Sequence, residues 1–480
     1  MKLRNPSALL ACILPFFAGC AVGPDYVRPA VDTPALFKEA GTPGDWKPAE
    51  PRDDAPRGAW WTLYGDARLN ALVEQVAVDN QNVRAAEATY RQALAALGVA
   101  RSGGWPTLSS GLSASRGEAA TTAGGTTVSS VRTTDRLSLS VSWEADVWGR
   151  IGRTVEANEA NAQAGAADLR AALLSAQATL VQSYLQLRAN DAARQLLDQT
   201  VGEYRRSLRI TRNRYEGGVA GRSDVVQAET QLKTAEAQAV DLGIQRAQLE
   251  HTIALLVGKA PAAFSLAAEP ALPALPEMPA AIPSQLLERR PDIAAAERRI
   301  AAANAQIGVA QAAYFPALTL GGTLGYQNDS FSQLLTAPNR FWSLGPALAL
   351  TLFDGGARAA AKEGALAGYD KSVATYRQTV LGAFQEIEDN LAALRVLAEE
   401  AGIQQQAATA ANELLKLTNN QYLAGTVSYL NVASAQAAAL SAERGRLDIQ
   451  SRRLLASVAL LKALGGDWRK PAAMDRKAVG

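Results

Sequence analysis

Four segments of the chain alternate apolar with small polar residues at a period of two. The clearest one spans 137–148, where the apolar positions are Leu137, Leu139, Val141, Trp143, Ala145 and Val147. Two later runs repeat the pattern at Leu318, Leu320, Leu324 and Tyr326 and at Leu344, Leu348, Leu350 and Leu352, and a weaker run over 107–115 has Leu108, Leu112 and Ala114 on one side. One run alone would suit a half-buried strand of a soluble sheet equally well. Four of them, each about 10 residues long, predict strands of a membrane β-barrel.

Two polar segments separate the paired strands. The first, 117–134, is rich in Gly, Ser and Thr, and the second, 327–340, is mostly polar. Such composition is typical of surface loops. We therefore expect each pair of strands to be joined by a long loop.

Very long helices follow each pair of strands. Residues 151–213 contain no proline and few glycines, which predicts one helix of roughly 90 Å at 1.5 Å per residue. Its apolar positions step by three and four residues at Val201, Tyr204, Leu208, Thr211 and Tyr215, and the last helices do the same at Val380, Ile387, Leu391 and Leu394 and at Leu447, Leu454, Val458 and Leu461. Narrow stripes on Ala- and Gln-rich helices indicate helices packed side by side in a wall.

The two halves of the chain resemble each other. Residues 82–87 match 292–297 at an offset of 210, and Tyr215 and Gly218 match Tyr422 and Gly425 at an offset of 207. The small drift predicts an internal duplication. The first repeat spans 61–260 and the second 284–468, separated by a Pro-rich linker at 261–283. The expected hairpins of strands are 107–148 and 317–353, and the expected helical hairpins are 151–257 and 356–465.

The N-terminus has the features of an export signal. Lys2 and Arg4 precede an apolar stretch that ends in Ala18-Gly19-Cys20, which predicts a lipoprotein signal peptide at 1–19 and a lipid on Cys20. A plain signal peptide with an incidental cysteine is the alternative. Cys12 is the only other cysteine and lies in the removed segment, so the mature chain has no internal disulfide. A Pro-rich linker at 20–60 follows, and 469–480 forms a C-terminal tail.

Composition argues against several classes of function. The chain has 48 Lys and Arg against 46 Asp and Glu, so no basic excess points to nucleic acid. Its single histidine, His251, has no cysteine beside it, which excludes a Cys/His metal cluster and a nucleophilic triad. Carboxylate pairs such as Glu386 and Glu388 suit solvated helix faces. We therefore expect no enzymatic activity, no metal and no cofactor other than an N-acyl diacylglyceryl lipid on Cys20.

Four strands alone cannot form a closed barrel inside a membrane. An open sheet leaves two unpaired edges, and lipid cannot satisfy their backbone groups. Two copies would give 8 strands, a size that its own side chains fill, whereas three copies give 12 and leave room for a lumen. The residues alone therefore predict a homotrimer whose helices continue the strands as a hollow cylinder.

Five dispersed motifs carry a resemblance to a known family. They are Cys20-Ala21-Val22-Gly23-Pro24-Asp25-Tyr26, Trp60-Trp61, Trp143-Glu144-Ala145-Asp146-Val147-Trp148-Gly149-Arg150, Leu287-Glu288-Arg289-Arg290-Pro291-Asp292 and Ala463-Leu464-Gly465-Gly466-Asp467-Trp468. Over nearly the whole mature chain, the sequence resembles the outer membrane factor family of the TolC class, and in particular its lipid-anchored NodT/OprM-like branch of multidrug efflux ducts.

The resemblance implies both the fold and the partners. It implies a mixed α+β membrane protein, a trimeric 12-stranded transmembrane β-barrel with four strands per chain that continues into a long periplasmic α-helical barrel. The chain would be lipid-anchored in the outer membrane of a Gram-negative bacterium. It would passively conduct drugs and toxic compounds from a periplasmic adaptor and an inner-membrane pump, by this branch one of the resistance–nodulation–division type. The alternative is a periplasmic structural or adaptor-like coiled-coil lipoprotein without a channel.

The resemblance also assigns roles to two helical turns. The residues expected to meet the adaptor are Gly218, Val219, Ala220, Gly221, Arg222 and Ser223 in the first turn and Gly425, Thr426, Val427 and Ser428 in the second. The residues expected at a periplasmic gate are Leu430, Ser434, Asp224, Tyr215 and Tyr422. The resembling family carries an acidic ring at the position of Ser434. Because Ser434 is uncharged, we expect a gate that is closed mainly by the packing of Leu430. Glycine should end the first helix of each turn, and Ser223 or Ser428 should help to start the next.

Overall fold

The computed structural model describes residues 21–31, 37–39, 58–276 and 289–466. The signal peptide, Cys20, most of the N-terminal linker and the C-terminal tail lie outside the described residues. The chain divides into two compact units. The first takes its described residues from Met1–Ala30, Thr89–Ala166 and Ala295–Tyr376, and the second from Val31–Ala88, Ala167–Ala294 and Arg377–Gly480.

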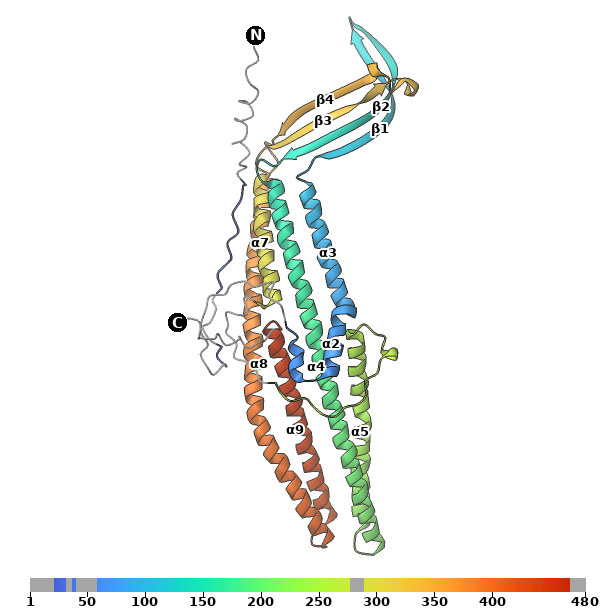
Figure 1. Ribbon diagram of the computed structural model, residues 1–480, viewed down its shortest axis with the longest axis vertical. Coiled ribbons are helices and arrows are strands. Elements are labelled where there is room, and N and C mark those ends of the chain that lie inside the picture. Colours follow the sequence, from blue (N-terminus) through green and yellow to red (C-terminus); the bar gives the residue numbers. More distant parts are fainter. Residues whose placement is uncertain (1–20, 32–36, 40–57, 277–288, 467–480) are drawn as a thin grey trace, which may run out of the picture. The chain divides into compact units, whose positions relative to one another are not determined.

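The first unit contains one antiparallel sheet (Figure 1). Its strands are β1 (Thr107–Ala123), β2 (Thr126–Ala145), β3 (Ala317–Asn328) and β4 (Arg340–Ala349), hydrogen-bonded in the order β1-β2-β3-β4. Leu139, Leu324 and Trp342 lie opposite one another across three strands, and the next row is Ser140, Thr323 and Ser343. Because neighbouring residues of a strand point to opposite faces, one face of the sheet is apolar and the other polar. Both hairpins contain the strands that alternation predicts.

Two expectations about this sheet are wrong. The segment 117–134 is not a loop, because β1 and β2 stay paired out to Ala123 and Thr126 and turn only at Gly124 and Gly125. Both glycines have positive φ, +61° and +83°, as a tight two-residue hairpin turn requires. The fourth strand also ends at Ala349 rather than including Leu350 and Leu352. Its partner β3 begins at Ala317, opposite Ala349, and so offers nothing for later residues to pair with.

The helices repeat in pairs of equal length. α4 (Arg150–Glu216) and α8 (Ala357–Leu423) have 67 residues each, and α5 (Arg222–Leu256) and α9 (Tyr429–Ala463) have 35 each. Shorter helices are α2 (Ala67–Asp79), α3 (Gln81–Ser102) and α7 (Pro291–Ala312), and short 3-10 turns are η2 (Trp60–Tyr64), η3 (Pro261–Ala263), η4 (Phe331–Gln333) and η5 (Ala337–Asn339). The matching lengths agree with the predicted duplication. None of the described helices is both long enough and apolar enough to cross a membrane.

The second unit is built around a core that draws on both repeats. Leu69, Val73 and Val76 of α2 pack with Leu180 and Tyr184 of α4 and with Val458 and Leu461 of α9. The Tyr64 and Ser457 hydroxyls lie 2.8 Å apart inside this core. The described part of the predicted inter-repeat linker is tethered here, because Arg188 donates to the Ala271 carbonyl at 2.6 Å and Arg246 to the Leu266 carbonyl at 2.6 Å.

In the first unit, a strap formed by residues 21–30 lies along α4 and α7. Gly23 has a φ of +110°, and a Cβ atom there would lie 2.5 Å from the Cα of Gly308, so this close approach requires glycine. The Val22 amide donates to the Trp148 carbonyl at 3.2 Å, and Arg153 forms an ion pair with Asp25 at 3.1 Å. These contacts bring the strap to the junction between β2 and α4.

Candidate functional site

Two helical turns in the second unit have the same backbone geometry. The first tip (217–221) joins α4 to α5, and the second tip (424–428) joins α8 to α9. Gly218 and Gly425 have φ of +74° and +77°. The Val219 amide donates to the Arg214 carbonyl at 2.8 Å, and the Thr426 amide donates to the Gln421 carbonyl at 3.0 Å. This is the left-handed glycine stop of a Schellman motif, so the prediction that glycine ends both helices is confirmed.

The expected serine caps are confirmed only in the position of Ser428, which is the N-cap residue of α9. Before α5 the N-cap residue is Gly221, and Ser223 lies inside the first turn. Neither tip has a side-chain capping bond. The Asp224 amide instead donates to the Gly221 carbonyl at 3.1 Å, and the Asn431 amide to the Ser428 carbonyl at 3.2 Å. Backbone carbonyls therefore accept the amide hydrogen bonds that the serine hydroxyls were expected to accept.

Tyr422, at the end of α8, joins the second tip to α4 of the first. Its side chain is buried, and its hydroxyl donates to the Thr211 hydroxyl at 3.3 Å. The Tyr429 ring meets it edge to face, with centroids 5.6 Å apart and an interplanar angle of 68°. Such an edge-to-face pair is attractive beyond the area it buries. The two aromatic rings thus form a small core of their own between the hairpins, and we call Tyr422, Tyr429, Thr211 and Arg214 the tip cluster.

Arg214 closes the tip cluster from the first repeat. The central guanidinium carbon lies 4.8 Å from the centroid of the Tyr422 ring, within cation–π range. One of its terminal nitrogens also donates to the Leu423 carbonyl at 3.2 Å. A single cation of the first repeat therefore holds both the ring and the backbone at the end of α8.

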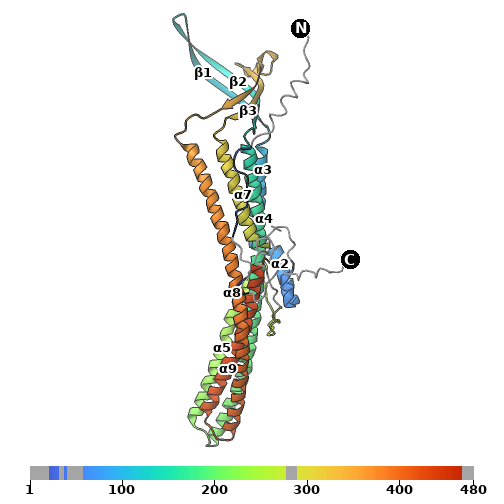
Figure 2. The same cartoon turned by 90° about the vertical axis from the view of Figure 1, so that its left-hand side faces the viewer.

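Amide side chains form further hydrogen bonds between the two helical hairpins, from α5 to α9 and from α9 to α4. Gln231 donates to the Ala433 carbonyl at 2.9 Å, and Gln436 of α9 donates to the Ser207 hydroxyl of α4 at 2.9 Å. Figure 2 shows α5 and α9 side by side. Sequence reasoning missed these glutamines as well as Arg214 and Tyr429. The available signal was the pair of tyrosines, Tyr422 and Tyr429, that flank one short turn.

Burial, with smaller contributions from the Tyr204 and Tyr422 phenols and the Asp224 carboxylate, raises the pKa of Tyr429 to about 12, although the nearby Ser207 hydroxyl opposes this shift. Its phenol is therefore neutral at physiological pH. The tip cluster combines one fixed positive charge, on Arg214, with two buried aromatic rings.

The predicted gate residues do not all meet in the structure. Tyr422 is buried in the tip cluster, whereas Leu430 is 60% exposed and Tyr215 is 43% exposed. Ser434 is exposed one turn after Leu430 and donates back to the Leu430 carbonyl at 3.0 Å. Asp224 is half-buried. Leu430 and Ser434 share one face of α9, and their place at a constriction stays a prediction.

The predicted adaptor-contacting residues lie mainly on the surface. The exposed ones are Gly218, Val219, Gly221, Arg222, Ser223, Gly425, Thr426 and Ser428. Ala220 and Val427 are half-buried, and Val427 packs against the tip cluster. Adaptor binding at these residues stays a prediction.

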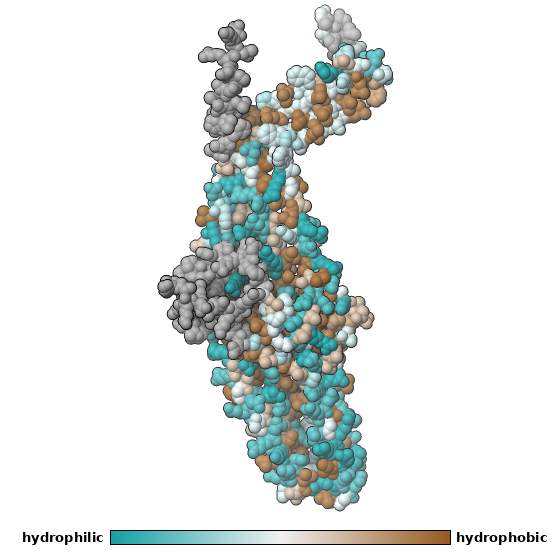
Figure 3. Space-filling model, viewed as in Figure 1, coloured by the Kyte–Doolittle hydropathy of each residue, from teal (hydrophilic) through white to brown (hydrophobic). Residues whose placement is uncertain are grey.

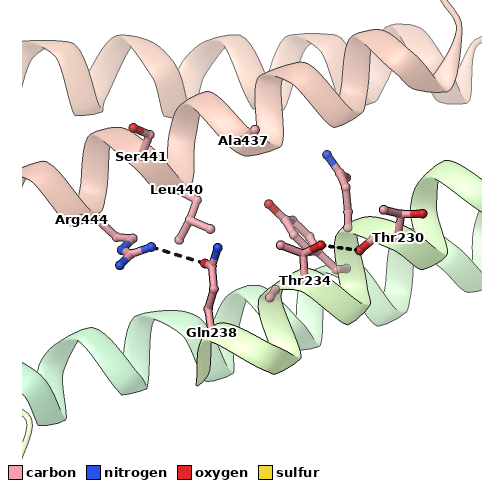
Figure 4. A pocket seen from close by; sticks show the side chains of 10 residues that line it. Thr230, Thr234, Gln238, Ala437, Leu440, Ser441 and Arg444 are labelled. Atoms are coloured by element: carbon pink, nitrogen blue, oxygen red, sulfur yellow. Dashed lines mark hydrogen bonds between the residues drawn. The ribbon is translucent and has the colours of Figure 1, made fainter. Parts of the chain in front are cut away.

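A groove of about 410 Å³ runs between α5 and α9 (Figure 4). Thr230, Thr234 and Gln238 line one side, and Leu440, Ser441 and Arg444 line the other. Arg444 donates to the Gln238 amide oxygen at 3.3 Å across it. The described residues contain no group of His, Cys, Asp and Glu side chains suited to a metal ion.

Comparison with known proteins identifies relatives along almost the full chain. The family model for "Outer membrane efflux protein" matches residues 72–259 and 282–466, one segment in each repeat. The pyoverdine export outer membrane protein OpmQ of Pseudomonas aeruginosa is 30% identical over 478 residues, and the alignment covers 98% of each chain. The cation efflux system protein CusC of Escherichia coli is 28% identical over 97% of this chain and all of its own.

A solved structure leads to the same family. The outer-membrane channel OprN is 31% identical and matches with a TM-score of 0.85. The alignment covers 94% of this chain and all of the OprN chain. The predicted fold class, a trimeric outer-membrane channel with four strands and long helices per chain, is confirmed by this likeness. The predicted role as an exit duct for efflux and the outer-membrane location are confirmed by the relatives. This chain belongs to the outer membrane efflux protein family.

Proposed function

We propose that the duct is gated at the helical tips, and that the tip cluster holds the gate in its closed arrangement. The observation that carries this proposal is the position of Tyr422, which is buried against Thr211 and stacked under Arg214. The contacts join one hairpin of the chain to the other. Separating the hairpins would break two hydrogen bonds of the tip cluster, from Tyr422 to Thr211 and from Arg214 to the Leu423 carbonyl, together with one cation–π contact on each chain, and would expose two rings.

The duct conducts passively in this proposal. Its transport requires no catalytic group, and His251 lies exposed on α5. Small molecules, including drugs and toxic compounds, would be selected by the pump rather than by a pocket of the duct. OpmQ, by its name, exports pyoverdine, and CusC, by its name, serves cation efflux. Relatives of similar sequence thus serve different cargo.

The partners follow from surfaces that one chain leaves open. β1 and β4 are the edge strands of the described sheet, and pairing them with a neighbouring copy satisfies their backbone groups in a homotrimer. At the tips, the apolar side chain of Val219 is 69% exposed and suits contact with a periplasmic adaptor. We assign the inner-membrane pump to the resistance–nodulation–division type by the branch resemblance.

The lipid anchor on Cys20 is part of the same proposal. The strap brings Ala21 next to Gly149, where a Cβ atom would lie 3.0 Å from the Ala21 Cα. This contact holds the chain that directly follows the proposed anchor at the junction of β2 and α4. This position agrees with anchoring in the outer membrane, where the sheet also lies.

A periplasmic coiled-coil lipoprotein accounts poorly for the sheet. Figure 3 shows apolar residues gathered over it. On its apolar face Trp342 is 72% and Leu344 78% exposed, more than a soluble monomer normally tolerates in one patch. Contact with lipid accounts for this exposure.

Replacement of Leu430 with Ala tests the gate. We expect the ionic conductance of the reconstituted trimer to increase, because an exposed apolar side chain in the first turn of α9 is shortened. Leu414→Ala is a matched control, since Leu414 is similarly exposed on α8 and lies outside the tips. Unchanged conductance in the Leu430 variant would remove Leu430 from the constriction.

A further inference from the structure

The polar face of the sheet is formed almost entirely by hydroxyls and glycines. Its members in the four paired strands include Ser109, Gly111, Ser113, Ser138, Ser140, Ser142, Thr319, Gly321, Thr323, Gly325, Ser343 and Gly345. On this face of β2, the stretch from residue 136 to residue 144 has two charged side chains, Arg136 and Glu144, one at each end. In a channel with its apolar face toward lipid, this polar face lines the passage.

Glu144 is neutralised by a neighbour. Arg150 donates to its two carboxylate oxygens at 2.9 and 2.7 Å, a bidentate pair at the end of β2 next to α4. A pair of this geometry presents little net charge to a passing ion. The lining is therefore close to neutral at this end of the strand.

Arg136, at the other end of the four-stranded part of the sheet, has a different partner. Its central guanidinium carbon lies 4.5 Å from the centroid of the Phe341 ring. Within the described residues Arg136 forms no ion pair, so the ring positions its charge without neutralising it. It precedes Ala145 by nine residues, or about 30 Å along the strand, close to the thickness of the hydrocarbon core.

Gly325 makes room for this arrangement. A Cβ atom at Gly325 would come within 2.9 Å of two atoms of the Phe341 ring, so only glycine lets the ring lie flat on the sheet. Gly325 is directly opposite Phe341 on β4 and Ser138 on β2. The ring thus lies on the polar face, and the guanidinium packed on it is held there too.

We infer that Arg136, seated on Phe341, determines the charge selectivity of the channel and favours anionic cargo. This inference rests on the proposed function, in which three copies of the sheet line one passage. Three guanidinium groups then form a ring of positive charge at the end of the four-stranded part of the sheet that is remote from α4, beyond which β1 and β2 continue as a pair. Arg132, four residues further on the same side of β2, adds to it. Molecules that carry a carboxylate, phosphate or sulfonate group would concentrate there.

The test is the reversal potential of open channels in a planar bilayer under a tenfold KCl gradient. We expect Arg136→Gln to lower the chloride-to-potassium permeability ratio by about threefold, because it removes the unneutralised charge. Arg136→Lys keeps the charge and should keep the ratio. The matched control is Arg340→Gln, which removes the same charge at the same end of the sheet but from the opposite face, where Arg340 is opposite Tyr326.

Ionic strength sharpens the test. The screening length falls from about 10 Å at 0.1 M salt to about 3 Å at 1 M, so the difference between wild type and Arg136→Gln should shrink at high salt. An equal effect of Arg136→Gln and Arg340→Gln, or no effect of either, would overturn the inference. If the wild-type oligomer passed no current at all, the proposed function would fail first.

Chemical modification gives a second measurement within one folded variant. The sequence has only Cys12 and Cys20, both near the N-terminus, so Arg136→Cys introduces one accessible thiol into the sheet. A positively charged methanethiosulfonate should restore the anion preference, and a negatively charged one should reverse it. The same reagents on Arg340→Cys should leave the permeability ratio unchanged. Equal responses of the two variants would contradict the assignment of Arg136 to the lining.

Discussion

The two helical tips have one backbone and two different surfaces. Gly218 and Gly425 make the same left-handed turn, closed by equivalent amide-to-carbonyl bonds. The tyrosines at equivalent positions nevertheless differ, since Tyr215 is 43% exposed and Tyr422 only 5%. The duplication therefore preserved the turn, while the side chains around it diverged into complementary partners.

The divergence reaches the rest of the tip cluster. At the offset of 207, Arg214 corresponds to the uncharged Gln421, and Tyr429 corresponds to Arg222. One tip contributes the cation and the other contributes the aromatic rings. The cation–π contact between the repeats pairs the cation of one tip with a ring of the other, so these diverged positions contribute to joining the hairpins.

The largest effect is expected from truncation of the buried tyrosine. Tyr422→Ala removes the ring that Arg214, Thr211 and Tyr429 all contact, and the loss of a buried aromatic side chain costs roughly 3 kcal/mol. We expect the open probability of the reconstituted channel to rise at least about tenfold, since about 1.4 kcal/mol corresponds to tenfold. Tyr215→Ala, at the equivalent exposed position, should change it less than about twofold. Similar effects of both substitutions would mean that the tips are functionally equivalent.

A smaller effect is expected from the cation of the first tip. Arg214→Gln gives the first repeat the residue type that the second already has at Gln421. The loss of a cation–π contact of about 1 kcal/mol should raise the open probability by about fivefold. Arg212→Gln removes an exposed charge from the same helix and serves as the control. An increase in the control as large as that in Arg214→Gln would exclude a specific role for the contact with Tyr422.

The smallest effect concerns pH. Because the pKa of Tyr429 is raised by burial to about 12, its neutral phenol stabilises the closed tips fully below pH 10. This contribution is lost as the pH rises from 10 through 12. Conductance of wild type should therefore increase more steeply over this interval than that of Tyr429→Phe, which cannot ionise. Parallel pH profiles for the two proteins would show that Tyr429 does not control the tips.

Much of the fold could be predicted because its signals are local. The proline-free run before Tyr215 predicts α4, and strict alternation after Leu137 predicts β2. The segment 117–134 was misassigned because its Gly, Ser and Thr content resembles a loop. Its strands are held by pairing across a two-glycine turn, and composition does not reveal whether a partner strand lies opposite.

The tip cluster was less accessible to prediction. Glycine positions and the duplication locate both turns, since each depends on a few adjacent residues. The contact between Arg214 and Tyr422 joins residues about two hundred positions apart, and it depends on which sides of the hairpins face each other. The serine hydroxyls make no capping bond for a local reason, because the carbonyls of Gly221 and Ser428 already accept the amides of Asp224 and Asn431.

The measurement that tests the account most directly is the single-channel conductance of the purified oligomer in a planar bilayer, with its mass determined in parallel. The account predicts the mass of three chains and small, mostly closed currents that grow strongly in Tyr422→Ala. A monomer, or a trimer that never conducts even with Tyr422 and Leu430 replaced, would contradict the gated duct and support a periplasmic coiled-coil lipoprotein.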